Sequence, residues 1–212
     1  MIVYDDVVTS TGEEKQTYLH YPQTAATTFS APSVMETFAG TGRGDATQLL
    51  TQVLAPAGPT SLYTYVNKSD GTYTGGNGYT FRVSVCASTT GSSCNSSNLE
   101  GEFVVVHEPV AGTNNTMPAV GMLSIVDSSH RAVQVQGSSP KVAVFPRGGT
   151  TYTSATFSST HNGIAQYIIT GLTAGTYSVS GPVTLTNQSV DANGVLYLEG
   201  AAGTYMVGRT GP

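Results

Sequence analysis

The sequence predicts an all-β protein, an antiparallel two-layer β-sandwich with many short strands and Gly-rich turns. Apolar and polar residues alternate in short runs along the chain, and Gly, Pro, Asn and Ser separate these runs. Helical spacing is confined to one segment. Many short strands joined by turn signals are typical of sandwiches. Because 212 residues can bury a full hydrophobic core, we expect a single domain over 1–212.

The alternation with a period of two places the strands in order along the chain. Turn chemistry supports the divisions, because "SDGT" (69–72) and "DANG" (191–194) supply Asp and Gly where a chain can reverse. In the last third, Gly-rich turns between successive strands favour a meander. The expected strands are 1–9, 15–21, 34–38, 47–54, 61–66, 79–86, 101–108, 120–126, 131–136, 141–146, 152–158, 164–170, 175–180, 183–186, 194–199 and 204–208.

One segment, "ATQLLTQVL" (46–54), has Leu spacing that a helix could use. Its Thr and Val content and the following "APAGP" favour a strand, because β-branched residues fit strands better than helices. The strongest loop signal is "AGTNNTMP" (111–118), but composition does not change across it. We therefore do not divide the chain there.

Composition excludes several classes of function. Charged residues make up 10% of the chain and the net charge is −5, with eight Lys and Arg residues scattered singly, so we expect no nucleic-acid partner. The longest apolar runs, such as "FVVVH" and "KVAVF", fall far short of the roughly 20 residues of a membrane-spanning helix. A surface built from uncharged polar residues is typical of extracellular β-proteins.

The N-terminal segment carries no secretory signal, because Met1 is followed directly by a strand-like "IVY" and the acidic pair Asp5 and Asp6. We expect that a signal was removed or belongs to a longer precursor, which makes the chain a fragment or C-terminal portion of a larger secreted or periplasmic protein. Cys86 and Cys94 flank the turn-forming "ASTTGSS", and we expect a disulfide between them; the alternative is two unrelated thiols.

The order of several segments indicates a family. "IVYDDV", "KQTYLHYP", "GRGDATQLLTQVLAP", "YTFRVSV" and "GEFVVVHEPV" are followed by "MPAVGML", "KVAVFPRGG", "YIITGLTAGTYSV" and "GVLYLEGAAGTY". Taken in this order, they resemble the C-terminal β-sheet region of heparinase II/III-like polysaccharide lyases. The resemblance spans nearly the whole chain.

The resemblance implies a non-catalytic role. In that family, catalysis is attributed to Tyr, His and an amide or acidic residue between an N-terminal α/α toroid and the first part of the β region, and no residue of this chain matches those motifs. The implied parent enzyme is a polysaccharide lyase, with its catalytic domain as partner and an acidic polysaccharide as a further partner. The expected job is to pack against the toroid or extend its substrate cleft.

Residue chemistry gives no catalytic site either. β-Elimination on a uronic acid needs a base, an acid and a group that neutralises the carboxylate. His20, His107, His130 and His161 are the candidate bases, but no spacing motif joins them, and solvated or structural histidines are the favoured interpretation. A Gly-x-Ser-x-Gly elbow is missing, and the carboxylates are spread out.

The best binding candidates are four tyrosines in a short hairpin, Tyr63, Tyr65, Tyr73 and Tyr79, because aromatic faces can stack on sugar rings; the alternative is that they cover the edge of the core. Asn67, Asp70 and Asn77 supply oxygens that Ca²⁺ accepts, without the dense carboxylates of an EF-hand, so we expect no cofactor or metal. The rival function is a free-standing carbohydrate-binding or adhesive β-module, and the third is a complete small enzyme.

Overall fold

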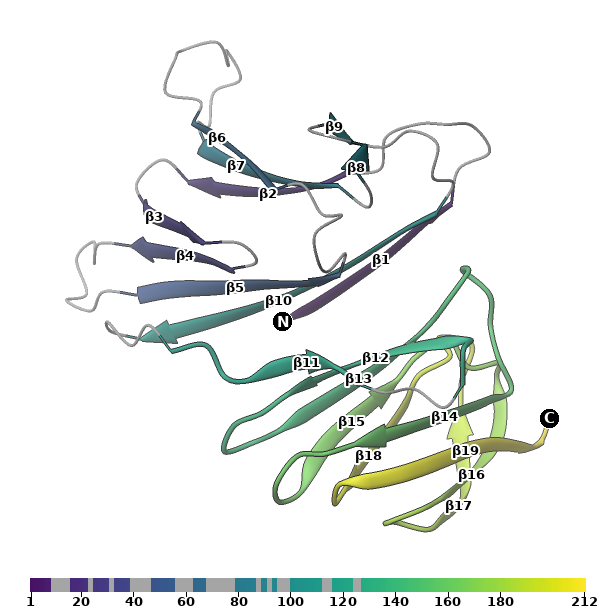
Figure 1. Ribbon diagram of the computed structural model, residues 1–212. Helices are drawn as coiled ribbons and strands as arrows, with labels where there is room; N and C mark the ends of the chain where they lie inside the picture. Colours follow the sequence, from purple (N-terminus) through teal and green to yellow (C-terminus); the bar gives the residue numbers. More distant parts are fainter. Residues whose placement is uncertain are drawn as a thin grey trace. The chain divides into compact units, whose positions relative to one another are not determined.

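A computed structural model describes the chain except residues 9–15, 23–24, 31–32, 39–46, 56–62, 68–78, 87–88, 91–92, 95–99, 112–115 and 124–126. Every regular element in the described part is a β-strand (Figure 1), which confirms the all-β fold class. The same residues contain no helix of the length and hydropathy needed to cross a membrane. The chain forms two compact units, Met1–Met117 and Pro118–Pro212, each described by itself. The expectation of one domain over 1–212 stays a prediction.

The described residues of the first unit form three sheets. Five strands form the largest, in the order β1-β10-β5-β4-β3, and the two others have the orders β2-β7-β6 and β8-β9. The bounds are β1 (Ile2–Val8), β2 (Gln16–Pro22), β3 (Ala25–Ser30), β4 (Ser33–Phe38), β5 (Thr47–Ala55), β6 (Tyr63–Asn67), β7 (Tyr79–Cys86), β8 (Thr89–Thr90), β9 (Ser93–Cys94) and β10 (Glu100–Ala111).

In the five-stranded sheet, β10 lies between β1 and β5 and pairs antiparallel with both. Its run of Phe103 to Val106 is buried, and Leu50 and Val53 of β5 are buried beside it. A bulge between Val104 and Val105 shifts the register against β5. The segment with possible helical spacing is therefore a strand, as its β-branched residues predicted.

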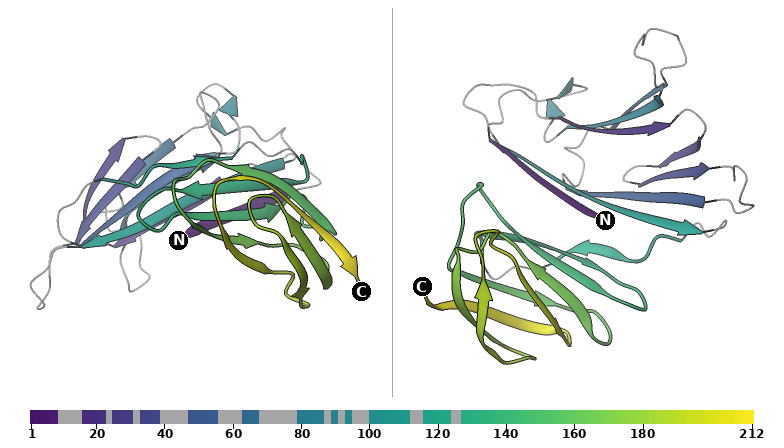
Figure 2. Two further views of the ribbon diagram at one scale, coloured as in Figure 1. Left: turned by 90° about the horizontal axis from the view of Figure 1, so that it is seen from below. Right: turned by 180° about the vertical axis from the view of Figure 1, so that it is seen from behind.

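The second unit is a two-layer sandwich, in which sheets ordered β11-β12-β13-β15-β18 and β14-β19-β16-β17 face each other (Figure 2). Side chains from both sheets form one core around Phe157, Tyr167, Tyr177 and Tyr205. The bounds are β11 (Val120–Met122), β12 (His130–Val135), β13 (Lys141–Pro146), β14 (Ser154–Ser159), β15 (Ala165–Ile169), β16 (Gly175–Ser180), β17 (Leu185–Val190), β18 (Leu196–Gly200) and β19 (Gly203–Gly211).

The connections correct the expected meander of the last third. The chain leaves the first sheet after β13, forms β14 in the second sheet and returns as β15, which lies beside β13 and parallel to it. It crosses again before β16 and after β17, so consecutive strands of this part often belong to opposite layers. Each strand has one buried face whichever sheet it joins, so alternation alone does not show which strand pairs with which.

The predicted turn at 191–194 joins β17 to β18. The Asp191 carboxylate accepts hydrogen bonds from the backbone and side chain of Asn193 at 2.9 Å, and the backbone N–H of Gly194 donates to the Asp191 carbonyl at 3.0 Å. Gly194 has a φ of +68°, and a Cβ there would collide with the carbonyl oxygen of Leu172. The turn therefore needs both the Asp and the Gly that the sequence supplies.

Candidate functional site

A buried polar cluster lies at one end of the sandwich core. The hydroxyl of Tyr167 lies 2.5 Å from Nε2 of His161 and 2.8 Å from Oγ of Ser159, and it donates to the carbonyl of Ala201 at 3.0 Å. The hydroxyl of Tyr205 donates to the same carbonyl at 2.6 Å. The cluster thus joins β14, β15 and β19 to the turn between β18 and β19, where Ala201 lies, through hydrogen bonds between side chains and one backbone acceptor.

A His and a Tyr in hydrogen-bond contact are groups that could move a proton during β-elimination. Here, however, Tyr167 is fully buried and His161 is 4% exposed. Because the Tyr167 hydroxyl donates its hydrogen bond to the Ala201 carbonyl, it can only accept from His161. Nε2 of His161 is therefore the protonated nitrogen and donates a hydrogen bond to the Tyr167 oxygen. Burial, with the hydrogen bond and charge of Tyr167, raises the pKa of Tyr205 well above its usual range. The burial of these side chains makes the cluster inaccessible to a polymer.

His130 forms a second pair, with Asp127. Its Nδ1 lies 3.1 Å from the Asp127 carboxylate, and its fully buried ring lies 4.9 Å from the ring of Tyr152, measured between centroids. Partial burial opposes ionisation of Asp127, but the backbone N–H of Ser129 and the nearby His130 more than compensate, so its pKa is lowered. An Asp that orients a His is part of many catalytic arrangements, but this imidazole cannot contact a substrate.

The other two histidines lie in the first unit. His107 of β10 is half-buried, and its Nδ1 lies 2.9 Å from Oγ1 of Thr51. Burial lowers its pKa, and the positive N-terminus lowers it further. The terminal amine of Met1 donates to the backbone carbonyl of His107 at 2.6 Å, which explains that charge effect. His20 lies on β2, where it pairs with Arg82 of β7. His20, His107 and His130 thus lie on β2, β10 and β12, whereas His161 lies in the connection between β14 and β15.

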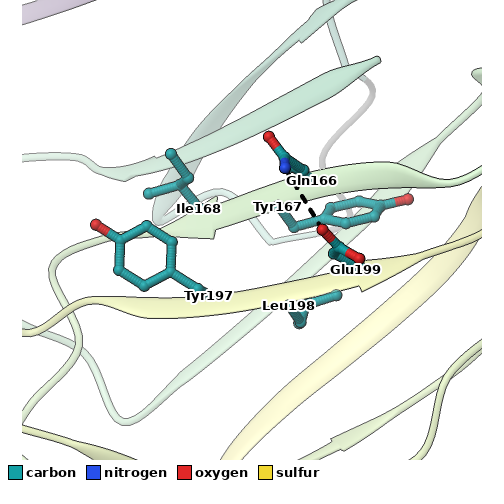
Figure 3. A pocket seen from close by; sticks show the side chains of 6 residues that line it. All are labelled: Gln166, Tyr167, Ile168, Tyr197, Leu198 and Glu199. Atoms are coloured by element: carbon teal, nitrogen blue, oxygen red, sulfur yellow. Dashed lines mark hydrogen bonds between the residues drawn. The ribbon is translucent and has the colours of Figure 1, made fainter. Parts of the chain in front are cut away.

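An open hollow of about 350 Å³ lies over β15 and β18 of the second unit. Gln166 and Ile168 of β15, with Tyr197 and Glu199 of β18, line it from the side opposite the core (Figure 3). The amide of Gln166 donates to the carboxylate of Glu199 at 3.4 Å, as the dashed line marks (Figure 3). Tyr197 is 68% exposed and Ile168 is 38% exposed. Tyr167 and Leu198 complete the lining but are buried.

The predicted sugar-binding tyrosines lie in the first unit. Tyr63 and Tyr65 belong to β6, where the strand period of two puts their positions on one face, opposite Val85 and Val83 of β7. Tyr79 begins β7, and Tyr73 lies outside the described residues. The side chains of this hairpin are likewise outside them. Sugar binding there stays a prediction.

The predicted Cys86–Cys94 disulfide and the Ca²⁺ ligands stay predictions as well. Cys86 ends β7. In the β8–β9 hairpin, Cys94 pairs with Thr89, which is three positions after Cys86 in the sequence. Asn67 ends β6, whereas Asp70 and Asn77 lie outside the described residues. Within the part of the chain that the structure describes, no three His, Cys, Asp or Glu side chains form a group suited to a metal.

The hollow was not predicted from the sequence, although both of its strands were. "AQYII" and "LYLEG" alternate, so their outward residues could have been read as Gln166, Ile168, Tyr197 and Glu199. Their convergence depends on β15 pairing with β18, which places Gln166 opposite Glu199 and Ile168 opposite Tyr197. The sequence carries no direct signal for that pairing.

Part of the chain matches a known protein family. Residues 127–209 match the model of the heparinase II C-terminal domain. They lie within the second unit, and the match confirms the recognition of a C-terminal region of heparinase II/III-like proteins for these residues. A search of curated proteins finds no match to the chain.

Proposed function

We propose, from the premise that residues 127–209 form a heparinase II C-terminal domain, that the chain is the non-catalytic β-region of a polysaccharide lyase. It packs against a catalytic toroid or extends the cleft in which the toroid holds its polymer. The working environment is secreted or periplasmic, where such polymers are found. The carboxylated chain of a uronic-acid polysaccharide is the substrate of the whole enzyme, and the toroid supplies its chemistry.

The observation that carries this proposal is the burial of the acid–base groups in the second unit. His130 and Tyr167 are fully buried, and His161 is nearly so. A general base must come within hydrogen-bond reach of the proton that it removes, either directly or through one water. Each of these groups instead completes a hydrogen bond inside the sandwich. Their placement favours a structural function.

The test of the non-catalytic role is a turnover assay. The purified 212-residue chain is incubated with heparin, hyaluronan and alginate, and the absorbance of unsaturated products is followed. We expect no product. Product formation that coelutes with the chain in gel filtration would overturn the proposal. As the positive arm, a heparinase-type lyase truncated before its own C-terminal domain is assayed with and without the added chain, and we expect a gain in activity or a stable complex.

The second candidate function is carbohydrate binding without catalysis. The hollow over β15 and β18 favours it, because an exposed aromatic ring lies beside an amide–carboxylate pair, the combination by which proteins contact both the apolar and the hydroxyl-bearing faces of sugars. The two candidates are compatible, since a domain that extends a polymer cleft gains from contacts with the polymer. Retention on a polysaccharide without product formation would support this second function.

A further inference from the structure

We propose that the hollow over β15 and β18 is a saccharide subsite that binds an uncharged pyranose ring of a glycan chain. Tyr197 stacks on the apolar face of the ring, and the Gln166–Glu199 pair hydrogen-bonds its hydroxyls. The proposal rests on the carbohydrate-binding function above and names its site and sugar class. It differs from the hairpin of Tyr63 and Tyr65, which lies in the first unit.

Strand pairing builds the subsite from two cross-strand rows on the outward face of the sheet. One row is Ala143, Ile168 and Tyr197, and the other is Lys141, Gln166 and Glu199, each contributed by β13, β15 and β18. Neighbouring strands lie about 4.8 Å apart, so each row spans roughly 10 Å. The first row is apolar and ends in an aromatic ring, whereas the second is polar. Because Ala143 is only 7% exposed, a glycan would contact both rows over β15 and β18.

Exposure separates this face from an ordinary sheet surface. Four large hydrophobic side chains are exposed in the described part of the second unit, and three of them lie at this face. Ile164 immediately precedes β15, Ile168 lies on β15, and Tyr197 lies on β18. The fourth, Met206, lies on β19 of the other sheet. Ile168 lies directly opposite Tyr197 on the neighbouring strand, which places an apolar side chain next to the aromatic one in the lining of the hollow. A flat, exposed aromatic ring is the group on which the C–H face of a pyranose stacks.

The polar groups specify the charge of the sugar. Gln166 supplies an amide that can donate and accept, and Glu199 supplies a carboxylate that accepts hydrogen bonds from hydroxyls. The Glu199 carboxylate would repel a uronate or sulfate placed in the hollow. The bound ring is therefore uncharged at this point, as in a neutral glycan or at the uncharged unit of an alternating acidic polymer. The cationic residue of the polar row is Lys141, which lies opposite Gln166 on β13 and two strands from Glu199.

Affinity electrophoresis of the full chain tests the subsite, with gels that contain heparin, hyaluronan, alginate or a neutral β-glucan. We expect at least one polymer to retard the chain, and Tyr197→Ala to weaken that binding about tenfold, the loss of roughly 1.4 kcal/mol of stacking. Tyr197→Phe keeps the ring and should keep most of the binding. Glu199→Gln should weaken binding to the same polymer. Met206→Ala, on the outward face of the other sheet, is the matched control and should bind normally.

The outcomes separate this inference from the proposed function. Binding that survives Tyr197→Ala but is lost in Tyr63→Ala with Tyr65→Ala overturns the subsite and leaves carbohydrate binding intact. Absence of retardation in all four polymers overturns the subsite and leaves the accessory role in the lyase intact. Product formation in the turnover assay overturns the non-catalytic role and leaves the subsite to be judged by its own variants. Unchanged far-ultraviolet circular dichroism of Tyr197→Ala excludes misfolding as the cause of lost binding.

Discussion

Two tyrosines in the same pair of strands have opposite surroundings. Tyr167 of β15 faces the core and is fully buried, and its hydroxyl contacts Ser159, His161 and Ala201. Tyr197 of β18 faces outward and is 68% exposed beside Ile168. The two faces of this sheet thus use the same residue type for different purposes. The ring of Tyr167 packs in the core and stabilises the sandwich, whereas the ring of Tyr197 is accessible to a ligand.

The largest expected difference is in stability. Tyr167→Ala removes a fully buried aromatic ring and the hydroxyl that contacts Nε2 of His161, so we expect a loss of about 3–5 kcal/mol in the free energy of unfolding. Tyr197→Ala removes an exposed ring and should change it by no more than about 0.5 kcal/mol. Urea unfolding of the full chain, followed by near-ultraviolet circular dichroism of the tyrosines, measures both. Similar losses in the two variants would contradict the inward–outward assignment.

A milder change isolates the polar cluster from the packing. Tyr167→Phe keeps the ring but removes the hydroxyl, which leaves Nε2 of His161 and the hydroxyl of Ser159 without that contact. We expect a loss of about 1–3 kcal/mol in the free energy of unfolding, because buried polar groups lose a partner that water cannot replace. The double variant with His161→Phe should cost less than the sum of the two single variants, and simple additivity would show that the contact contributes nothing.

Alkaline pH tests the same inward face. The folded-state pKa of Tyr205 is raised above its unfolded value of about 10, so the folded state favours the neutral phenol. This contribution to stability is fully present below pH 10 and is lost as the pH rises from there toward the higher folded-state pKa. We expect the midpoint of thermal unfolding to fall above about pH 10, and Tyr205→Phe to flatten that fall. An equal fall in the variant would assign the alkaline loss to other groups.

The contrast between the two faces also shows how far sequence reasoning extends. The strands that carry Tyr167 and Tyr197 were predicted, because "AQYII" and "LYLEG" alternate with a period of two. Their pairing was not, because β15 lies between β13 and β18 after two crossings between layers, and local patterns do not record such non-local contacts. The short strands β3, β8 and β9 were missed for a related reason, since two to six residues rich in Ala, Thr and Ser give weak alternation.

The family resemblance and the chemistry differ in the same way. The order of the strands was enough to recognise a heparinase II-type C-terminal region, now matched over 127–209. The candidate tyrosines were sought where aromatics are dense in the sequence, between 63 and 79. A binding face can instead be assembled from one outward residue on each of several strands, and Tyr197 has no aromatic neighbour within the "GVLYLEG" segment. Density along the chain is therefore a poor guide to density on a sheet.

The smallest expected effect sharpens the charge assignment of the outward face. Lys141 is exposed on β13, two strands from Glu199 in the polar row, so Lys141→Ala should leave the free energy of unfolding within about 0.5 kcal/mol of the original. If the glycan continues along this row, Lys141 contacts the next sugar. Lys141→Ala should then weaken the binding of uronic-acid polymers about twofold to threefold, because a surface charge pair contributes less than about 1 kcal/mol. Binding of a neutral β-glucan should not change. Affinity electrophoresis at two salt concentrations measures this, because salt should reduce only the Lys141 contribution. Equal weakening for neutral and acidic polymers would mean that Lys141 hydrogen-bonds to hydroxyl groups of the sugar. The site would then not distinguish charged from neutral polymers at this position.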